Sequence, residues 1–312
     1  MDQAPLHNDV ALGPAGGKAF WIHTSDDVRL RIGLWQNERT FEGTVLFFPG
    51  RTGYVERYGL LAEKLEKQGL ASVVIDWRGH GLSDRLTGAP KVCHVKTFID
   101  YQRDVDAMAQ SAKQLGLPKP WHLVGSSMGA CIGLRAAIEG LQVASCGFVA
   151  PMWGVNLAPI QRAAAWPLSW AAQTLGKGHT YAPGQDAQSY VVKTPFAENT
   201  MTHDEEMYQH FKNQLETHPS LQLGGPSMGW LFECLKECRA LSKLASPKIP
   251  TATFCGSQDK DVDAKVIKQR MINWPNGQFE IIPDAKHDIL SERTEVRDHV
   301  IGKFVELFRS TN

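Results

Sequence analysis

The sequence lacks an excess of charge of either sign, a dense set of cysteines and a long apolar run. Lys and Arg together number 33, as do Asp and Glu, so nucleic-acid binding, which needs a basic surface, is not favoured. Six scattered cysteines in 312 residues do not make a disulfide framework, and Cys234 and Cys238 lack the second pair of ligands of a zinc site. No apolar run approaches the ~18 residues that crossing a bilayer requires.

The N-terminal residues 1–18 are expected to be a flexible segment. They are polar, contain Pro and Gly, and have neither the basic start nor the apolar stretch of a signal peptide. A cytoplasmic location is therefore expected, and peripheral contact with a membrane stays open. A composition of 43% hydrophobic and 21% charged residues predicts a packed globular protein and leaves its oligomeric state open.

Beyond residue 18, short apolar runs alternate with segments of helical spacing. A continuous apolar run such as residues 44–48 is typical of a strand buried on both faces. Strands are expected near residue 20 and at 28–35, 44–48, 71–75, 123–124, 146–149, 251–255 and 279–282, and helices at 58–68, 98–115, 128–139, 262–271 and 296–307. The first two strands form a hairpin, and the later alternation predicts an α/β protein with a mostly parallel sheet and helices on both faces.

The alternation breaks over residues 153–225, which we interpret as an inserted, mainly helical cap. The core is then expected at 19–152 and 226–312. An insertion at this point would cover the carboxyl ends of the strands, where open α/β sheets bind ligands. Trp153, nearest to the sheet, is the candidate for contact with substrate, while most other aromatic residues of the insertion are expected to pack the cap itself.

A nucleophile is predicted at Gly125-Ser126-Ser127-Met128-Gly129, which fits the pattern G-x-S-x-G. An expected strand precedes it and an expected helix follows, as a nucleophile elbow requires. The helix N-terminus favours negative charge that develops beside it. Ser127 is therefore the predicted nucleophile, Ser126 occupies the variable position, and an ordinary Gly/Ser turn is the alternative.

A serine nucleophile needs a histidine base held by a carboxylate. In proteins with this kind of nucleophile elbow, the acid follows the serine in the chain and the histidine follows the acid. His287 comes soon after the strand expected at 279–282 and is the candidate base. The turn after residue 255 offers three aspartates. Asp259 is favoured, Asp261 is the rival, and Asp263 is interpreted as a helix N-cap.

Two backbone donors are expected to stabilise the oxyanion of the tetrahedral intermediate. The N–H of Met128 directly follows the nucleophile. The second is assigned to the N–H of Arg51, in the loop that begins at Pro49-Gly50. Since both are backbone groups, Arg51→Ala is expected to keep the donor.

Four segments resemble the motifs of the monoglyceride lipase and lysophospholipase group of α/β-hydrolases, and of its lysophospholipase L2 type in particular. They are the loop Asp76-Trp77-Arg78-Gly79-His80-Gly81-Leu82-Ser83, the elbow at 125–129, the acid turn Gly256-Ser257-Gln258-Asp259, and the loop at 285–292 that contains His287. The chain departs from the group at Pro49, where His is frequent, and at Ser126, where the group has His. His80 is interpreted as structural.

The resemblance implies an α/β-hydrolase fold, Asp259 as the acid, and hydrolysis of a carboxylic ester in a single-chain lipid, a lysophospholipid or a monoacylglycerol. The expected partner is this small-molecule lipid ester, and neither a metal nor an organic cofactor is implied. A peptidase, thioesterase or acyltransferase on the same triad is the alternative. A non-catalytic binding module on the same scaffold is the alternative from another class.

Overall fold

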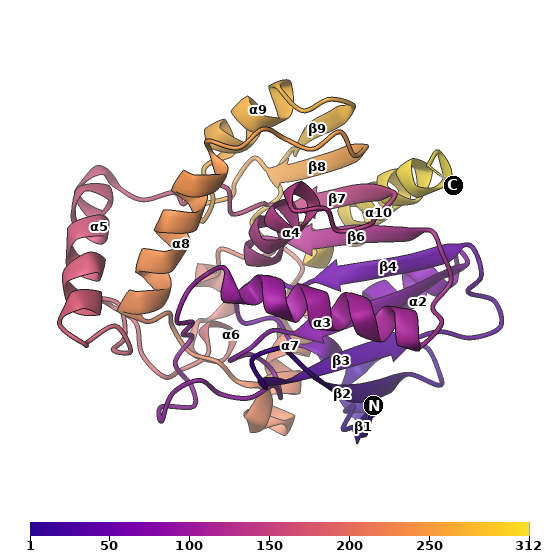
Figure 1. The fold of residues 1–312 in the computed structure, drawn as a ribbon, viewed down its shortest axis with the longest axis horizontal. Coiled ribbons are helices and arrows are strands. Elements are labelled where there is room, and N and C mark those ends of the chain that lie inside the picture. The colour runs from indigo at the N-terminus through magenta and orange to yellow at the C-terminus, as the bar shows by residue number, and fades with distance from the viewer. Residues whose placement is uncertain (312) are drawn as a thin grey trace.

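A computed structural model describes residues 1–311 except the side chain of residue 162. Its centre is a nine-stranded sheet in the order β1-β2-β3-β5-β4-β6-β7-β8-β9 (Figure 1). The pairs β1/β2, β2/β3 and β3/β5 are antiparallel, and all later pairs are parallel. The strands are β1 Gln3–Ala4, β2 Lys18–His23, β3 Arg29–Trp35, β4 Gly43–Phe48, β5 Leu70–Asp76, β6 Trp121–Ser126, β7 Ser145–Val149, β8 Thr251–Gly256 and β9 Gly277–Ile282.

Helices cover both faces of this sheet, which confirms the predicted fold class. They are α1 Asn8–Ala11, α2 Gly59–Glu66, α3 Asp100–Gln114, α4 Met128–Ile138, α5 Pro159–Thr174, α6 Tyr190–Lys193, α7 Glu205–Thr217, α8 Met228–Leu241, α9 Ala264–Ile272 and α10 Thr294–Arg309. One apolar cluster lies between the sheet and α3, α4, α8 and α9, and the other between the sheet and α2 and α10. In Figure 1, α3 and α4 lie in front of the sheet and α10 lies behind it.

The apolar run of β4 shows why the central strands contain few polar residues. Leu46 and Phe48 belong to the first cluster, whereas Val45 and Phe47 belong to the second. Successive side chains of a strand point to opposite faces, so a strand between two helical layers buries every residue. The same arrangement aligns the carboxyl ends of β4, β6, β7, β8 and β9 along one edge of the sheet.

The N-terminal segment is not the flexible tail that its composition suggests. β1 pairs with β2, and Val10 and Ala11 of α1 are buried. The side-chain amide of Gln214 donates to the carbonyl oxygen of Val10 at 2.8 Å. The prediction of flexibility was wrong because two very short elements, each too short to show a period, are held by contacts with distant parts of the chain.

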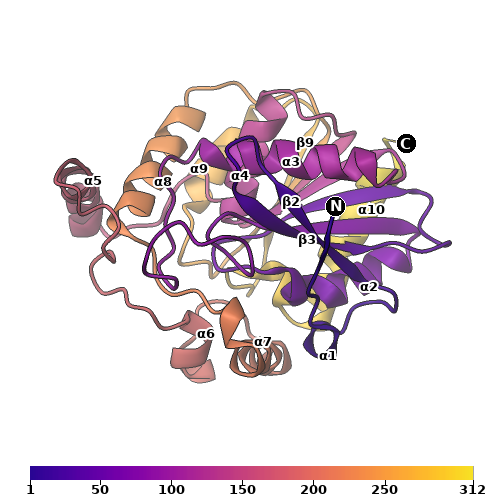
Figure 2. The same cartoon turned by 60° about the horizontal axis from the view of Figure 1, so that its bottom comes forward.

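The excursion between β7 and β8 contains α5, α6, α7 and α8. α5 and α8 lie side by side, while α6 and α7 lie on the other side of the molecule near α1 (Figures 1 and 2). The predicted insertion ends at residue 225, just before α8. Trp230 and Cys234 of α8 pack in the core cluster beside α4, and Phe232 contacts Trp166 of α5 at 5.4 Å between ring centroids. α8 thus belongs to both the core and the cap.

None of the helices in residues 1–311 combines the length and the apolar character needed to cross a membrane.

Candidate active site

The backbone at Ser127 forms a sharp turn between β6 and α4. Its φ of 49° and ψ of −113° lie in a region that non-glycine residues rarely occupy. The neighbouring glycines make the turn possible, because a Cβ on Gly129 would lie 1.9 Å from the carbonyl oxygen of Phe48 and one on Gly125 would lie 2.8 Å from the Cα of Ala130. The strained turn places the Ser127 side chain at the tip, where it is half-buried rather than enclosed.

Three side chains that are distant in the chain meet beside this turn. His287 Nε2 lies 3.0 Å from Ser127 Oγ, and His287 Nδ1 lies 2.8 Å from Asp259 Oδ2. The serine comes from the end of β6, the aspartate from the loop after β8 and the histidine from the loop after β9. Both distances are within hydrogen-bond range, so a proton can move from the hydroxyl to an imidazole whose other nitrogen faces a carboxylate.

The rival aspartate takes part in holding Asp259. The backbone N–H groups of Asp261 and Val262 donate to Asp259 Oδ1 at 2.8 and 3.2 Å, which leaves Oδ2 for the imidazole. The structure thus brings Asp259, and not Asp261, to His287. Asp263 is the N-cap of α9, as predicted, and accepts a hydrogen bond from the N–H of Lys265 at 3.0 Å.

The environment of His287 favours the protonated imidazolium. Burial lowers its pKa, but the hydrogen bond and charge of Asp259, with smaller contributions from Asp261 and Asp288, outweigh burial and raise the pKa from 6.5 to about 9. An imidazolium stabilised in this way is the species that forms when the base takes the serine proton.

The loop that carries His287 is fixed by residues that sequence reasoning missed. Arg57 donates to Asp288 Oδ2 at 2.6 Å, and the hydroxyl of Ser291 donates to the same oxygen at 2.9 Å. The Arg57 guanidinium also lies 3.8 Å from the ring centroid of Phe211 in α7. Arg57 and Asp288 are separated by 231 positions, so no local pattern in the sequence predicts that they form an ion pair.

The segment before α7 holds the same loop through its backbone. The N–H groups of His287 and Asp288 donate to the carbonyl oxygens of Thr200 and Met201 at 3.4 and 2.8 Å. The ammonium group of Lys286 donates to the carbonyl oxygen of Asn199 at 2.9 Å. The histidine loop and part of the excursion between β7 and β8 therefore form one hydrogen-bonded unit.

Of the two expected oxyanion donors, Met128 directly follows Ser127, and Arg51 lies in the loop that passes close to it. Met128 is the first residue of α4, where the N–H has no partner in the helix ladder. Arg51 follows Gly50 in a turn closed by a hydrogen bond from Gly53 N–H to Gly50 O at 3.1 Å. A Cβ on Gly50 would lie 3.3 Å from Ser127 Cβ, so this loop passes directly over the nucleophile.

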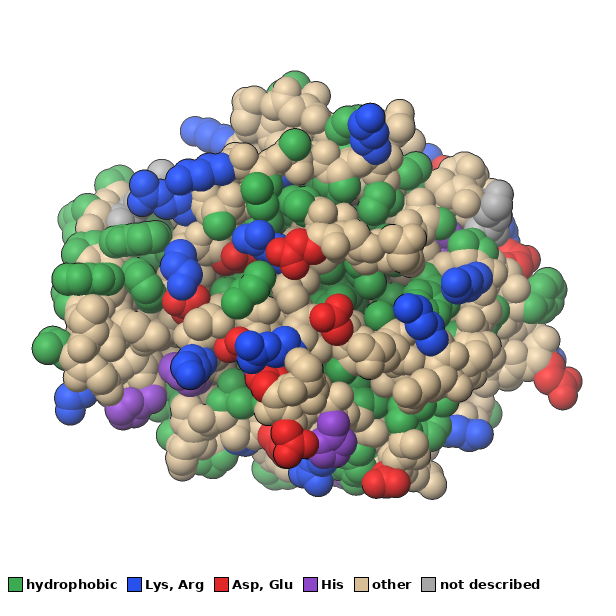
Figure 3. Space-filling model, viewed as in Figure 1, with side chains coloured by type: hydrophobic (Ala, Val, Ile, Leu, Met, Phe, Trp, Pro, Cys, Tyr) green, Lys and Arg blue, Asp and Glu red, His purple; other side chains and the backbone are tan. Residues whose placement is uncertain are grey.

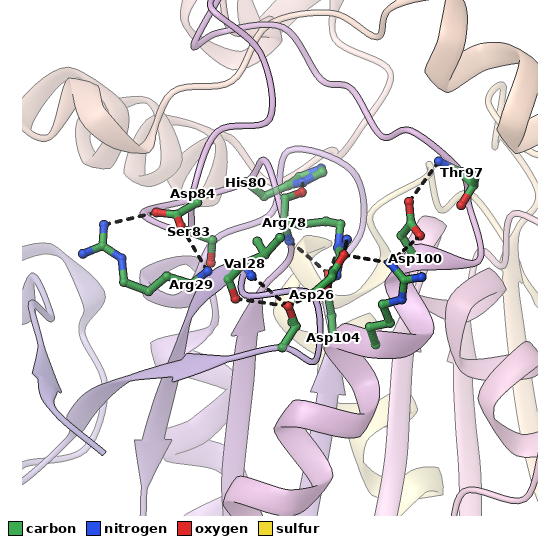
Figure 4. A network of polar contacts seen from close by, with 12 residues as sticks. Asp26, Val28, Arg29, Arg78, His80, Ser83, Asp84, Thr97, Asp100 and Asp104 are labelled. Carbon is green, nitrogen blue, oxygen red and sulfur yellow. Dashed lines mark hydrogen bonds and ion pairs between the residues drawn. The ribbon is translucent and has the colours of Figure 1, made fainter.

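The Asp76–Ser83 loop is held in place by a network of polar contacts (Figure 4). Arg78 forms ion pairs with Asp26 and Asp104 at 2.9 and 2.8 Å. His80 Nδ1 lies 3.0 Å from the carbonyl oxygen of Arg78, and burial lowers the pKa of His80 to about 3. His80 is therefore a neutral group within a hydrogen-bonded turn, as the sequence analysis interprets it.

Trp153 is not placed for contact with substrate. It is 2% exposed and its indole N–H donates to the carbonyl oxygen of Ala130 at 3.2 Å. Its ring packs between Phe148 and Trp274, at 5.5 and 5.8 Å between centroids. The expectation that Trp153 contacts substrate was wrong. Although Trp153 is close to the edge of the sheet, its side chain packs in the core and not in the cap.

Within the described part of the chain, potential metal ligands gather at His7, Asp9 and His218. His218 Nε2 lies 2.9 Å from Asp9 Oδ2, and the two imidazole rings stack at 3.7 Å. This group shares no residue with the Ser127–His287–Asp259 arrangement, whose chemistry uses no metal.

A serine on an elbow after a central parallel strand, with the acid after β8 and the histidine after β9, defines an α/β-hydrolase. Residues 39–294 match the Hydrolase_4 family, described as "Serine aminopeptidase, S33", and the chain belongs to this family.

Relatives and solved structures agree with this assignment. Lysophospholipase L2 of Escherichia coli is 27% identical over 299 residues, which are 92% of this chain and 86% of that protein. A probable lysophospholipase L2 of Haemophilus influenzae is 27% identical over 272 residues, covering 86% and 84%. A monoglyceride lipase structure from Saccharomyces cerevisiae has a TM-score of 0.71 at 19% identity and covers 93% of this chain and 94% of that one, which shows the shared fold.

Proposed function

We propose that this protein is a serine hydrolase that cleaves the carboxylic ester of a single-chain lipid through an acyl-enzyme intermediate. The observation that carries the proposal is the continuous hydrogen-bonded line from Ser127 Oγ through the imidazole of His287 to Asp259, with spacings of 3.0 and 2.8 Å. Ser127 is the nucleophile, His287 the general base and Asp259 the group that orients the imidazole.

In the first half of the reaction, Ser127 Oγ forms a bond to the ester carbonyl carbon while its proton passes to His287 Nε2. The backbone N–H groups of Arg51 and Met128 donate to the resulting oxyanion. Collapse of this intermediate breaks the bond to the alcohol oxygen, which takes the proton from His287. A water molecule, deprotonated by the same imidazole, then attacks the acyl-enzyme and releases the fatty acid and free serine.

The lipid substrate is supported by the relatives, which are named lysophospholipases, and by the fold shared with a monoglyceride lipase. The family description, "Serine aminopeptidase, S33", means that a peptidase activity is the alternative to be compared with the esterase. An aminopeptidase needs a free carboxylate to bind the substrate's α-amino group. Asp288, beside the base, is already paired with Arg57 and is not free for that role.

We also propose peripheral contact with a membrane, through α5, for a protein working on the cytoplasmic side. The exposed apolar side chains of this region are Ile160 at 84%, Leu168 at 54%, Trp170 at 52% and Leu175 at 77%. They contribute to the hydrophobic surface at the left edge of Figure 3, where α5 lies in Figure 1. A helix with this character binds at a lipid interface without crossing it.

A fluorophosphonate probe and a panel of substrates test the catalytic proposal. We expect the probe to label the wild type and the matched variant Ser126→Ala, and not Ser127→Ala. The panel compares a lysophospholipid, a monoacylglycerol, a p-nitrophenyl ester and an aminoacyl p-nitroanilide. Equal labelling of Ser127→Ala, or hydrolysis of the anilide alone, would contradict the proposal.

Cosedimentation with phospholipid vesicles tests the membrane contact. Replacing Leu168 and Trp170 by Ser should lower the bound fraction, because each loses apolar area that enters the interface. Ile272 on α9, 67% exposed, is the matched control, and Ile272→Ser should bind as the wild type does. Equal losses from the two variants would show that α5 has no special role.

A further inference from the structure

The guanidinium of Arg51 lies next to the proposed oxyanion loop without a carboxylate partner. The backbone of its neighbour Gly50 passes over Ser127, whereas the Arg51 side chain reaches toward α8, where its Cζ lies 5.9 Å from the ring centroid of Trp230. Arg51 is half-buried. The positive charge of Arg51 therefore lies between the proposed oxyanion loop and α8, the helix that belongs to both the core and the cap.

The groups around this charge do not neutralise it. Burial lowers the pKa of His80 to about 3 and raises the pKa of Cys93 to about 12, so both are uncharged at neutral pH. Among the described residues no ion pair includes Arg51. The buried Arg31, Arg57 and Arg78 each contact at least one carboxylate. In the same described part of the chain, the half-buried Arg85 and Arg270 also lack a carboxylate, but both donate hydrogen bonds to backbone carbonyl oxygens.

A half-buried guanidinium without a carboxylate partner is available to an anionic ligand, which would supply the negative charge that the protein does not. A planar guanidinium suits a phosphate, with which it can form two parallel hydrogen bonds. Lysophospholipids and monoacylglycerols share the acyl ester of glycerol and differ by a phosphate a few bonds away. A cation beside the oxyanion loop is therefore in the right region to distinguish them.

We propose that Arg51 binds the phosphodiester of a lysophospholipid head group and thereby makes the enzyme selective for lysophospholipids over monoacylglycerols. This inference rests on the proposed esterase function. It gives Arg51 two separate roles, an oxyanion donor through its backbone and a head-group ligand through its side chain. Only the second role depends on the guanidinium.

The test compares kcat/KM for a lysophosphatidylcholine and a monoacylglycerol with the same acyl chain. Arg51→Gln should lower the ratio of the two by roughly 10- to 100-fold, the size expected for a lost hydrogen bond to a charged group. Effects of the substitution on the loop are common to both substrates and cancel in the ratio. Arg51→Lys should fall between, since it keeps the charge and loses the planar fork.

Arg239 supplies the matched control. Its Cζ lies 5.5 Å from the ring centroid of Trp166, so it also places a guanidinium over a tryptophan, but near the far end of α8. Arg239→Gln removes the same charge and should leave the ratio unchanged. An unchanged ratio in Arg51→Gln, or an equal fall in both variants, would overturn the proposal.

Inhibition of p-nitrophenyl ester hydrolysis gives a measurement that does not depend on an active variant. Glycerophosphocholine should compete in the wild type and compete more weakly in any active Arg51 variant. Absence of competition in the wild type overturns the proposal, and equal competition by inorganic phosphate assigns the site to the free anion instead of the head group. A wild type that hydrolyses no ester refutes the proposed function, which is a different outcome from an active enzyme with an unchanged ratio.

Discussion

Replacing Asp259 by asparagine separates the charge of the acid from its shape. Asp259 Oδ2 lies 2.8 Å from His287 Nδ1. Burial lowers the pKa of His287, but the hydrogen bond and charge of Asp259 contribute most to raising it from 6.5 to about 9. That difference corresponds to about 3 kcal/mol of preference for the imidazolium. The same preference lowers the barrier for the step in which the imidazole takes the serine proton.

Above pH 9, where the imidazole is neutral in both proteins, the environment that produces this shift contributes up to about 10²-fold to turnover. The asparagine also disturbs the tautomer, so the expected loss in kcat for Asp259→Asn is about 10²- to 10⁴-fold. Asp261→Asn is the matched control, because only the backbone of Asp261 contacts Asp259. Its kcat should stay within a few-fold of the wild type.

The pH profile supplies a second reading of the same variant. The base must be neutral, so wild-type kcat/KM should rise with pH until about 9, where the raised pKa of His287 lies. In Asp259→Asn the midpoint should move down toward the ordinary value of 6.5. Wild-type turnover with an unmoved midpoint in Asp259→Asn, or a loss in Asp261→Asn instead, would refute this reasoning.

Three further outcomes follow from packing and charge. Gly129→Ala should lower the free energy of unfolding in urea by about 2 kcal/mol or more, since its Cβ would lie 1.9 Å from the backbone oxygen of Phe48. Gly302→Ala, in α10 with open space around it, should raise that free energy by ~0.5–1 kcal/mol. Arg57→Gln should cost about 3–5 kcal/mol because Asp288 keeps its buried charge without a partner, and adding Asp288→Asn should recover part of the loss.

The sequence carries the information for the sheet and the elbow because both leave local signals. β4 is buried on two faces, so its residues 45–48 are apolar without interruption, and the elbow requires glycines where any side chain would collide with backbone. The aspartates after β8 were harder to separate. Asp259 and Asp261 are two positions apart, and the choice depends on which side chain turns toward a loop 28 positions further along.

Contacts between distant segments could not be predicted in this way. Arg57 and Asp288 meet across the fold, and α1 is buried against a helix far along the chain although its own four residues show no period. Trp153 is an aromatic residue of the kind that lines ligand pockets, but its side chain is buried in the core. In each case the partner, rather than the residue itself, decides the outcome.

The attachments of the excursion between β7 and β8 differ at its two ends, and the difference has a consequence for catalysis. The segment near Met201 is bonded through its backbone to the histidine loop, so displacing it would disturb the position of His287. α5 packs chiefly on α8 and carries the exposed apolar side chains. The two ends of the excursion are therefore attached to different parts of the fold, one to the histidine loop and the other to α8. A displacement of α5 alone would therefore leave in place the contacts that hold the imidazole 3.0 Å from Ser127.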